Sequence, residues 1–145
     1  MNELIYNFLA AVQTAVSTAT NSATVLPGGL WYGRAPDDTG FPYGVVEVTN
    51  GKKTYTTNGF FLQNVTLKIT VFYTDGGVAA ASIKNIGLLL SGALDFKYLT
   101  MTSGKVISIH PAENIPSIDS ALRAAKDVFL GSFSWEVIIS GGNTL

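Results

Sequence analysis

Apolar residues near the start of the chain recur at the spacing of a helix. They fall one, three and four positions apart and comprise Leu4, Ile5, Phe8, Leu9, Val12, Ala15, Val16 and Ala19. This spacing places them on one stripe of an amphipathic helix, which we expect to cover a sheet. Asn2 is suited to cap the start of this helix, and the Ser- and Thr-rich residues 17–24 weaken its end.

Alternation of apolar and polar residues predicts the clearest strand between Phe60 and Tyr73. Gln63 interrupts its apolar face once; the other positions of that face are Phe61, Val65, Leu67, Ile69, Val71 and Tyr73. A second alternating stretch, 128–140, predicts the last strand. Shorter strands are expected at 30–32, 43–49 and 105–110. A helix is expected to end near Leu94, with a core-facing side formed by Ala79, Ile83, Ile86, Leu90 and Ala93.

Two Asn-Gly pairs punctuate the middle of the chain. Asn50-Gly51 is a strong hairpin signal because both residue types accept positive φ. A short polar strand, 53–57, and a second turn at Asn58-Gly59 would follow. The segment 50–59 therefore forms either two tight turns or one protruding arm. We interpret residues 117–126 as a loop in preference to a short helix.

The order of the expected elements is helix, several strands, helix and two strands. Strands gathered in runs with a helix between them favour an α+β fold. We expect an antiparallel or mixed sheet with the N-terminal helix and the central helix packed on one face. The length of 145 residues suits a single domain, 1–145.

The shortage of charge changes this picture from fold to function. Charged residues make up 13% of the chain, against about 25% in an average soluble domain. Hydrophobic residues reach 47% and the net charge is −1. Such a chain is expected to cover part of its surface with partners, since permanent interfaces resemble a domain core cut in half. The charge balance does not favour sequence-specific binding of nucleic acid, and no apolar run predicts a membrane span.

Few residues are suited to catalysis. The chain has no cysteine and one histidine, His110, so neither a Ser-His-Asp arrangement nor a thiolate metal site is predicted. Asp37 and Asp38 are adjacent within a Pro- and Gly-containing loop, where carboxylates more often form turns than act as an acid–base pair. We predict no catalytic residue, no metal and no cofactor. A small enzyme with an atypical site of scattered Asp, Tyr and Lys stays open as a weaker alternative.

The segment 30–46, in which Phe41-Pro42-Tyr43 is the motif-like part, resembles the front part of the tail terminator and tail-completion proteins of tailed bacteriophages. The run 67–77, followed by an Ala-rich helix, looks like the second half of that family, and 127–137 is similar to its last strand. The resemblance implies a virion protein, made in the host cytoplasm, that forms a closed ring, usually a hexamer. Its implied partners are itself, the tail tube protein that it caps and the head-tail connector protein.

Seven residues are candidates for a subunit interface in such a ring: Trp31, Arg34, Asp37, Asp38, Tyr55, Phe60 and Phe61. Aromatic residues dominate contacts of this kind. Trp31 fits the edge of the core equally well. Arg34 could pair with Asp37 or Asp38 in its own loop or across subunits. Alternatives to a terminator are another neck or minor tail protein, a host ligand-binding domain and the small enzyme.

Overall fold

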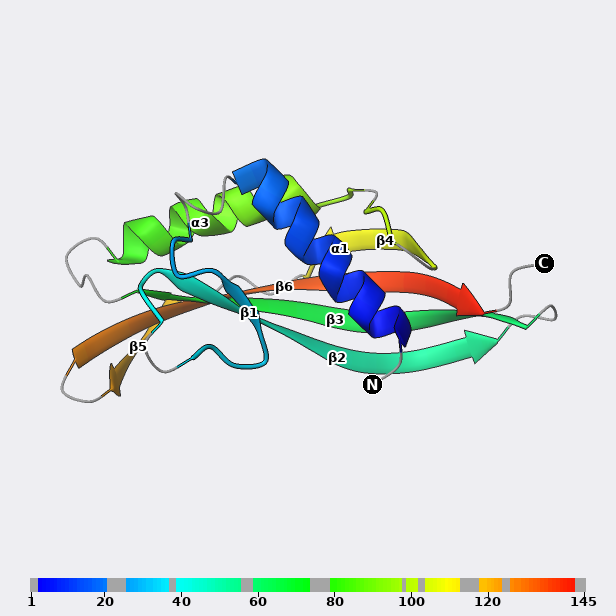
Figure 1. Ribbon diagram of the computed structural model, residues 1–145, viewed down its shortest axis with the longest axis horizontal. Coiled ribbons are helices and arrows are strands. Elements are labelled where there is room, and N and C mark those ends of the chain that lie inside the picture. The colour runs from blue at the N-terminus through cyan, green and yellow to red at the C-terminus, as the bar shows by residue number, and fades with distance from the viewer. Residues whose placement is uncertain are drawn as a thin grey trace.

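The computed structural model describes residues 3–20, 26–36, 39–55, 59–73, 79–97, 99–101, 104–112, 118–123 and 126–142. Two helices and six strands follow one another as α1 (Glu3–Thr20), β1 (Leu30–Tyr32), β2 (Tyr43–Tyr55), β3 (Phe60–Tyr73), α3 (Ala79–Leu94), β4 (Lys105–Pro111), β5 (Ile118–Arg123) and β6 (Lys126–Gly142). Both helices lie on the same side of one sheet (Figure 1). The α+β prediction, with the N-terminal and central helices on one face, is confirmed.

The sheet is built around β3 and its long pairing with β6. The strand order is β1-β2-β3-β6-β4, and β5 pairs with the first part of β6. Antiparallel pairs join β2 to β3, β3 to β6, β4 to β6 and β5 to β6. Only β1 and β2 run parallel, so the sheet is mixed. β1 and β4 are therefore the outermost strands at opposite edges.

The hydrophobic core lies between this sheet and the two helices, as the periodicity predicts. The helices contribute buried residues at the expected positions: Leu4, Ile5, Phe8, Leu9, Val12, Val16, Ile83, Ile86, Leu90 and Ala93. The central strands contribute Val65, Leu67, Ile69, Val71, Phe133, Trp135, Val137 and Ile139. The expected cap at Asn2, and the side chains of Ala19 and Ala79, lie outside the described residues.

Gln63 interrupts the apolar face of β3 as expected. It is 5% exposed, and its Oε1 is buried without a hydrogen-bond partner among the described residues. An unmet buried acceptor carries a desolvation cost, so Gln63 is a weak point of the core.

The tight turn at Asn50-Gly51, which belongs to one of the two alternatives for residues 50–59, is wrong. Both residues lie within β2, where a bulge between Asn50 and Lys53 shifts the register against β3. A Cβ atom at Gly51 would lie 2.9 Å from the backbone oxygen of Asn64, so the glycine allows the two strands to approach closely. β2 is accordingly longer than the predicted strand 43–49 and takes in part of the separate strand 53–57.

β2 and β3 form one long hairpin that extends beyond α1 and β4 (Figure 1). Residues 56–58, and so part of the predicted second turn, are outside the described residues.

The loop predicted for residues 117–126 is also wrong. Ile118–Arg123 form β5, which pairs with β6 from Lys126 to Gly131. The segment lacks a clear alternation of apolar and polar residues. Its strand conformation is instead imposed by backbone pairing with the long β6, a tertiary effect that local patterns do not carry.

Candidate assembly surfaces

The first surface lies at the β1 edge of the sheet. The backbone of Gly29 donates to Leu26 and accepts from Gly44, which closes the turn and aligns β1 with β2. Gly28 has no room for a Cβ atom beside the backbone of Gly40. Close backbone packing in this loop therefore fixes the position of the residues that follow Gly29.

Trp31 presents its ring on the face of the sheet opposite the helices. Trp31 pairs with Val45, whereas the next residue, Tyr32, points towards α1. Successive side chains of a strand point to opposite faces. The indole is 38% exposed, and its Nε1 donates a 2.7 Å hydrogen bond to the carbonyl oxygen of Gly28. A shallow hollow, here called the Trp31 hollow, is lined by Trp31, Arg34, Ala35 and Pro36.

Tyr32 points the other way and ties β1 to α1. Its hydroxyl donates a 2.6 Å hydrogen bond to the backbone oxygen of Leu9 and lies 3.0 Å from Oε1 of Gln13. Burial raises the pKa of the Tyr32 phenol above its ordinary value of 10.0. This bond anchors the edge strand, which leaves Trp31 in a fixed position.

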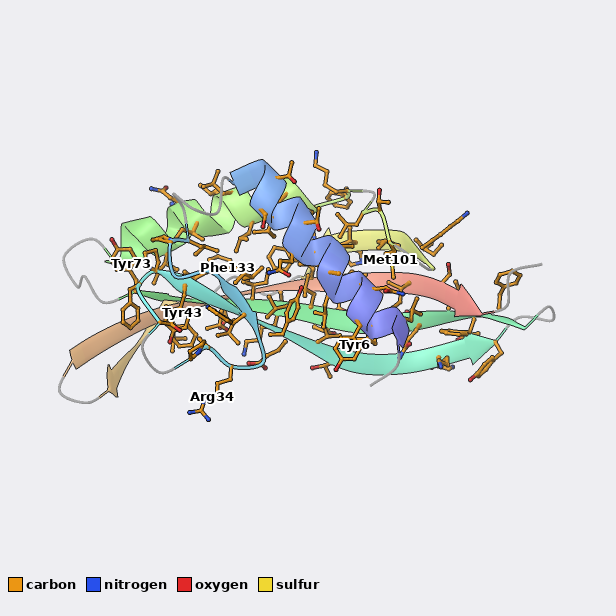
Figure 2. The ribbon with its side chains drawn as sticks, in the orientation of Figure 1. Tyr6, Arg34, Tyr43, Tyr73, Met101 and Phe133 are labelled. Carbon is orange, nitrogen blue, oxygen red and sulfur yellow. The ribbon has the colours of Figure 1, made fainter. Side chains whose placement is uncertain are left out.

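The charged candidates beside Trp31 are placed only in part. Arg34 is exposed, and Figure 2 shows its side chain extending away from the sheet. Asp37 and Asp38 lie outside the described residues, so the predicted pairing of Arg34 with either carboxylate stays a prediction.

The second surface is the end of the β2–β3 hairpin. Tyr55 is 68% exposed, and its ring lies tilted against Phe61 with centroids 5.9 Å apart. The ammonium of Lys53 lies 4.1 Å from the centroid of the Phe61 ring, in range of a cation–π interaction. Phe61 also packs against the core, and Phe60 is half-buried. Tyr55 is thus the exposed member of the predicted aromatic set at this end.

The described candidates therefore form two separate surfaces. Trp31 pairs with Val45 near the start of β2, and Tyr55 ends that strand. Ten residues of extended chain separate the two positions, roughly 30 Å at the rise of a strand. The structure does not bring the described members of the predicted interface set together in one patch.

A third apolar surface lies at the β4 edge, where the sequence did not predict one. Phe96 follows the end of α3 with φ +57° and is 78% exposed. Its backbone N–H donates a 2.8 Å hydrogen bond to Ile109 on β4. A left-handed conformation costs a residue with a Cβ atom about 1–2 kcal/mol, and glycine or asparagine is usual at the end of a helix. The lack of such a residue after Leu94 was the sequence signal that could have marked this position.

The β4 bulge adds a second exposed apolar side chain beside Phe96. The register of β4 against β6 shifts between Val106 and Ser108, and the intervening Ile107 is 54% exposed. Bulges commonly re-aim a side chain in this way. A hollow of about 270 Å³ is lined by Phe96, Lys97, Val106, Ile107, Ser108, Ile109 and His110.

The described residues show no arrangement suited to a metal ion. His110 is exposed on β4, and its Nδ1 lies 3.2 Å from the backbone oxygen of Pro111. Within the described ranges, no three side chains of His, Asp or Glu gather as metal ligands would. No helix in that part of the chain is both long and apolar enough to cross a bilayer.

No model of a known protein family matches the chain, and no curated protein matches it in sequence. The fold does match a solved structure. The chain is similar to a chain in the virion of a native gene transfer agent particle, with a TM-score of 0.76 and 15% sequence identity. The match covers 97% of this chain and 100% of the other. At that identity the match establishes a shared fold. A second solved structure aligns with a TM-score of 0.42 and 10% identity over 89% of this chain and 94% of its own, and we draw nothing from it.

Proposed function

We propose that this chain is a structural component of a phage-like virion and acts by assembling with other proteins. The observation that carries the proposal is the fold shared along nearly its whole length with a chain of a gene transfer agent virion. Fold alone does not determine function. The proposal therefore also depends on the low charge of the chain and on its exposed aromatic surfaces.

Within that class we propose a tail terminator of one domain, 1–145. It would form a closed ring, a hexamer, that caps the tail tube protein and docks to the head-tail connector protein. The resemblance at Phe41-Pro42-Tyr43 supports this assignment. The ring centroids of Phe41 and Tyr43 lie 5.3 Å apart. The Tyr43 ring stacks on that of Phe72 of β3, with centroids 4.9 Å apart. These residues hold the loop that leads into β2, so the family-like motif has a structural role.

Separate apolar surfaces on one subunit suit head-to-tail assembly. A closed ring needs two different surfaces on each copy, since each copy meets its two neighbours through unlike patches. The surfaces at Trp31, Tyr55 and Phe96 lie on different parts of the sheet. Exposed aromatic rings at such places are typical of the anchors that dominate protein interfaces.

We propose that the chain acts without catalysis. The hollows beside Trp31 and Phe96 are lined mostly by apolar side chains with a few basic ones. This lining suits protein contact better than acid–base chemistry, which needs ionisable groups that converge on a substrate.

Particle assembly with and without the chain tests the proposal. Deleting the gene from the phage or particle that encodes it should leave heads and tails that fail to join, and a plasmid copy should restore joined particles. Cryo-electron microscopy of restored particles should place the chain at the head-proximal end of the tail tube. Density elsewhere in the neck or tail would favour the alternative neck or minor tail protein. Absence of the chain from purified particles would contradict a virion role.

A further inference from the structure

The end of the β2–β3 hairpin projects from the body of the subunit. This part, here called the hairpin arm, comprises residues 52–55 of β2 and 60–62 of β3. Figure 1 shows both strands continuing past α1 and β4. The end of β6 pairs with the arm through Ser140, Gly141 and Gly142, whose small or absent side chains give it little cover. The arm therefore meets solvent on two faces.

Apolar side chains occupy both faces of the hairpin arm. Tyr55 and Phe61 are paired residues on one face, and Tyr55 is 68% exposed. Leu62 follows Phe61 along the strand, so it points to the opposite face, where it is 39% exposed. A flat partner surface could cover only one of these faces. A projecting element of this kind buries both when it enters a groove.

The hairpin arm also carries positive charge. Residues 48–74 include no Asp or Glu, whereas Lys52 and Lys53 lie in the arm. Lys52 is exposed. The ammonium of Lys53 lies 4.1 Å from the ring centroid of Phe61 and 5.8 Å from that of Tyr55. The two rings thus hold one charge beside the exposed Tyr55. A groove that receives the arm needs carboxylates at its rim, because ammonium groups that lose water require partners.

The described carboxylates of this chain do not form such a groove. Glu47 lies opposite Lys68 in the pairing of β2 with β3, and Glu136 lies opposite His110 in the pairing of β4 with β6. Asp95 accepts a hydrogen bond from a buried indole. None of these three carboxylates lines the hollows described above.

The two hollows of this chain carry basic residues instead. Arg34 lines the Trp31 hollow, and Lys97 and His110 line the hollow beside Phe96. Insertion of the hairpin arm into either hollow would bring like charges together within an apolar contact, which is unfavourable. The described surfaces of a second copy are therefore poorly suited to receive the arm, which favours a protein of different sequence.

We propose that the hairpin arm inserts into an apolar groove, rimmed by carboxylates, on a different protein of the particle. The inference rests on the proposed virion function and names the chemistry of one partner. Tyr55 and Leu62 fill the groove from the two faces of the arm, while Lys52 and Lys53 pair with the carboxylates. Two lysines are too few for the set of phosphate contacts that holds nucleic acid, so the arm suits an acidic protein better than DNA.

Photo-cross-linking tests which protein receives the arm, because the chain contains no cysteine. Thr54→Cys places one thiol at an exposed position of the arm and keeps Tyr55 in place. The full-length variant, labelled with a maleimide–diazirine reagent and added to particles that lack the chain, should link to one other protein. Mass spectrometry should locate the link beside Asp or Glu residues of that protein. Leu88→Cys, at a 63% exposed position on α3, is the control and should not give this adduct.

Charge reversal tests the electrostatic part of the contact with a matched control. Lys52→Glu should weaken binding to the purified partner by about tenfold or more, because it places like charges in the contact. Lys84→Glu makes the same change at an exposed position on α3 and should bind like the wild type. Changing the carboxylate nearest to the link in the partner to lysine should restore binding of Lys52→Glu. Both variants should keep the thermal stability of the wild type, since both lysines are exposed.

The outcomes separate this contact from the proposed function. The contact is overturned, while the virion role stands, if the chain enters particles but the arm links only to other copies or to nothing. Equal binding of Lys52→Glu and Lys84→Glu to the partner would overturn it as well. Tight binding of the wild-type chain to a labelled single-stranded DNA, lost in Lys52→Glu, would assign the arm to nucleic acid instead. If the chain is absent from purified particles, the proposed function fails and this contact fails with it.

Discussion

The indole Nε1 of Trp135 donates a 2.6 Å hydrogen bond to Oδ1 of Asp95, and so ties the middle of β6 to the end of α3. Trp135 is 1% exposed, so the bond gives a buried indole N–H its acceptor. Asp95 directly precedes Phe96 and also donates its backbone N–H to Ser91. The bond therefore fixes the turn from which Phe96 projects.

Asp95→Ala should lower the free energy of unfolding by about 1–3 kcal/mol, because it leaves the buried indole N–H without its acceptor. Asp95→Asn should cost less, since the amide oxygen can still accept. Urea denaturation of the two variants measures the difference. An unchanged free energy of unfolding for Asp95→Ala would show that the hydrogen bond contributes nothing. In a Trp135→Phe background the effect of Asp95→Ala should largely disappear, because the two residues act as a pair.

Two glycines of α3 give a matched test of how closely the helix approaches the sheet. A Cβ atom at Gly87 would clash with the ring of Phe133, whereas a Cβ atom at Gly92 would meet nothing within 4 Å. Gly87→Ala should destabilise the subunit by about 1–3 kcal/mol through overpacking. Gly92→Ala should stabilise it by up to about 1 kcal/mol, because alanine favours the helix. A thermal melt of each variant checks the prediction, and the same sign for both would contradict the packing of α3 on β6.

Tyr32 should make stability fall at alkaline pH. Its folded-state pKa is raised by burial above the unfolded value of 10.0. Its stabilising contribution is therefore complete below about pH 10 and is lost as pH rises through the folded-state pKa. Tyr32→Phe removes the bond to Leu9 and should cost about 0.5–1.5 kcal/mol at neutral pH. The difference between wild type and variant in urea denaturation should shrink above pH 10. A difference that stays constant to pH 11 would contradict this role of the phenol.

Variants at the end of the β2–β3 hairpin should distinguish a role in assembly from a role in folding. Tyr55→Ser should leave the free energy of unfolding within about 0.5 kcal/mol, because the side chain is 68% exposed. Phe61→Ala should lower it by about 1–2 kcal/mol, because its half-buried ring packs against the core. If Tyr55 anchors a partner, Tyr55→Ser should weaken binding to tail tubes or neighbouring subunits in co-sedimentation. Unchanged binding would remove Tyr55 from the candidate surface.

Periodicity predicts the parts of this fold that bury an apolar stripe. α1, α3, β3 and β6 all face the core through residues that the sequence pattern identifies, such as Phe8, Leu90 and Trp135. The failures fall where conformation depends on distant pairing. Asn50-Gly51 is compatible with a turn, but the chain continues to pair with β3 through Lys53 and Tyr55. The strand therefore has a bulge after Asn50 instead of a turn. β5 owes its strand conformation to β6 rather than to its own pattern.

The exposed residues of the candidate surfaces are likewise predicted only in part. Aromatic content alone singles out Trp31 and Tyr55, which the structure shows to be exposed on separate parts of the sheet. It also singles out Phe61, whose ring packs against the core of its own subunit. The hydrophobic pattern does not identify Phe96 or Ile107, because their exposure comes from the end of a helix and from a bulge. Neither feature leaves a pattern in local hydrophobicity.

Native mass spectrometry of the full-length chain, alone and with purified tail tubes, tests most directly whether these apolar surfaces exist for assembly. We expect a discrete closed oligomer, a hexamer, that appears as concentration rises or on the end of the tube. A chain that stays monomeric at the highest concentrations, both alone and with tubes, would contradict the account.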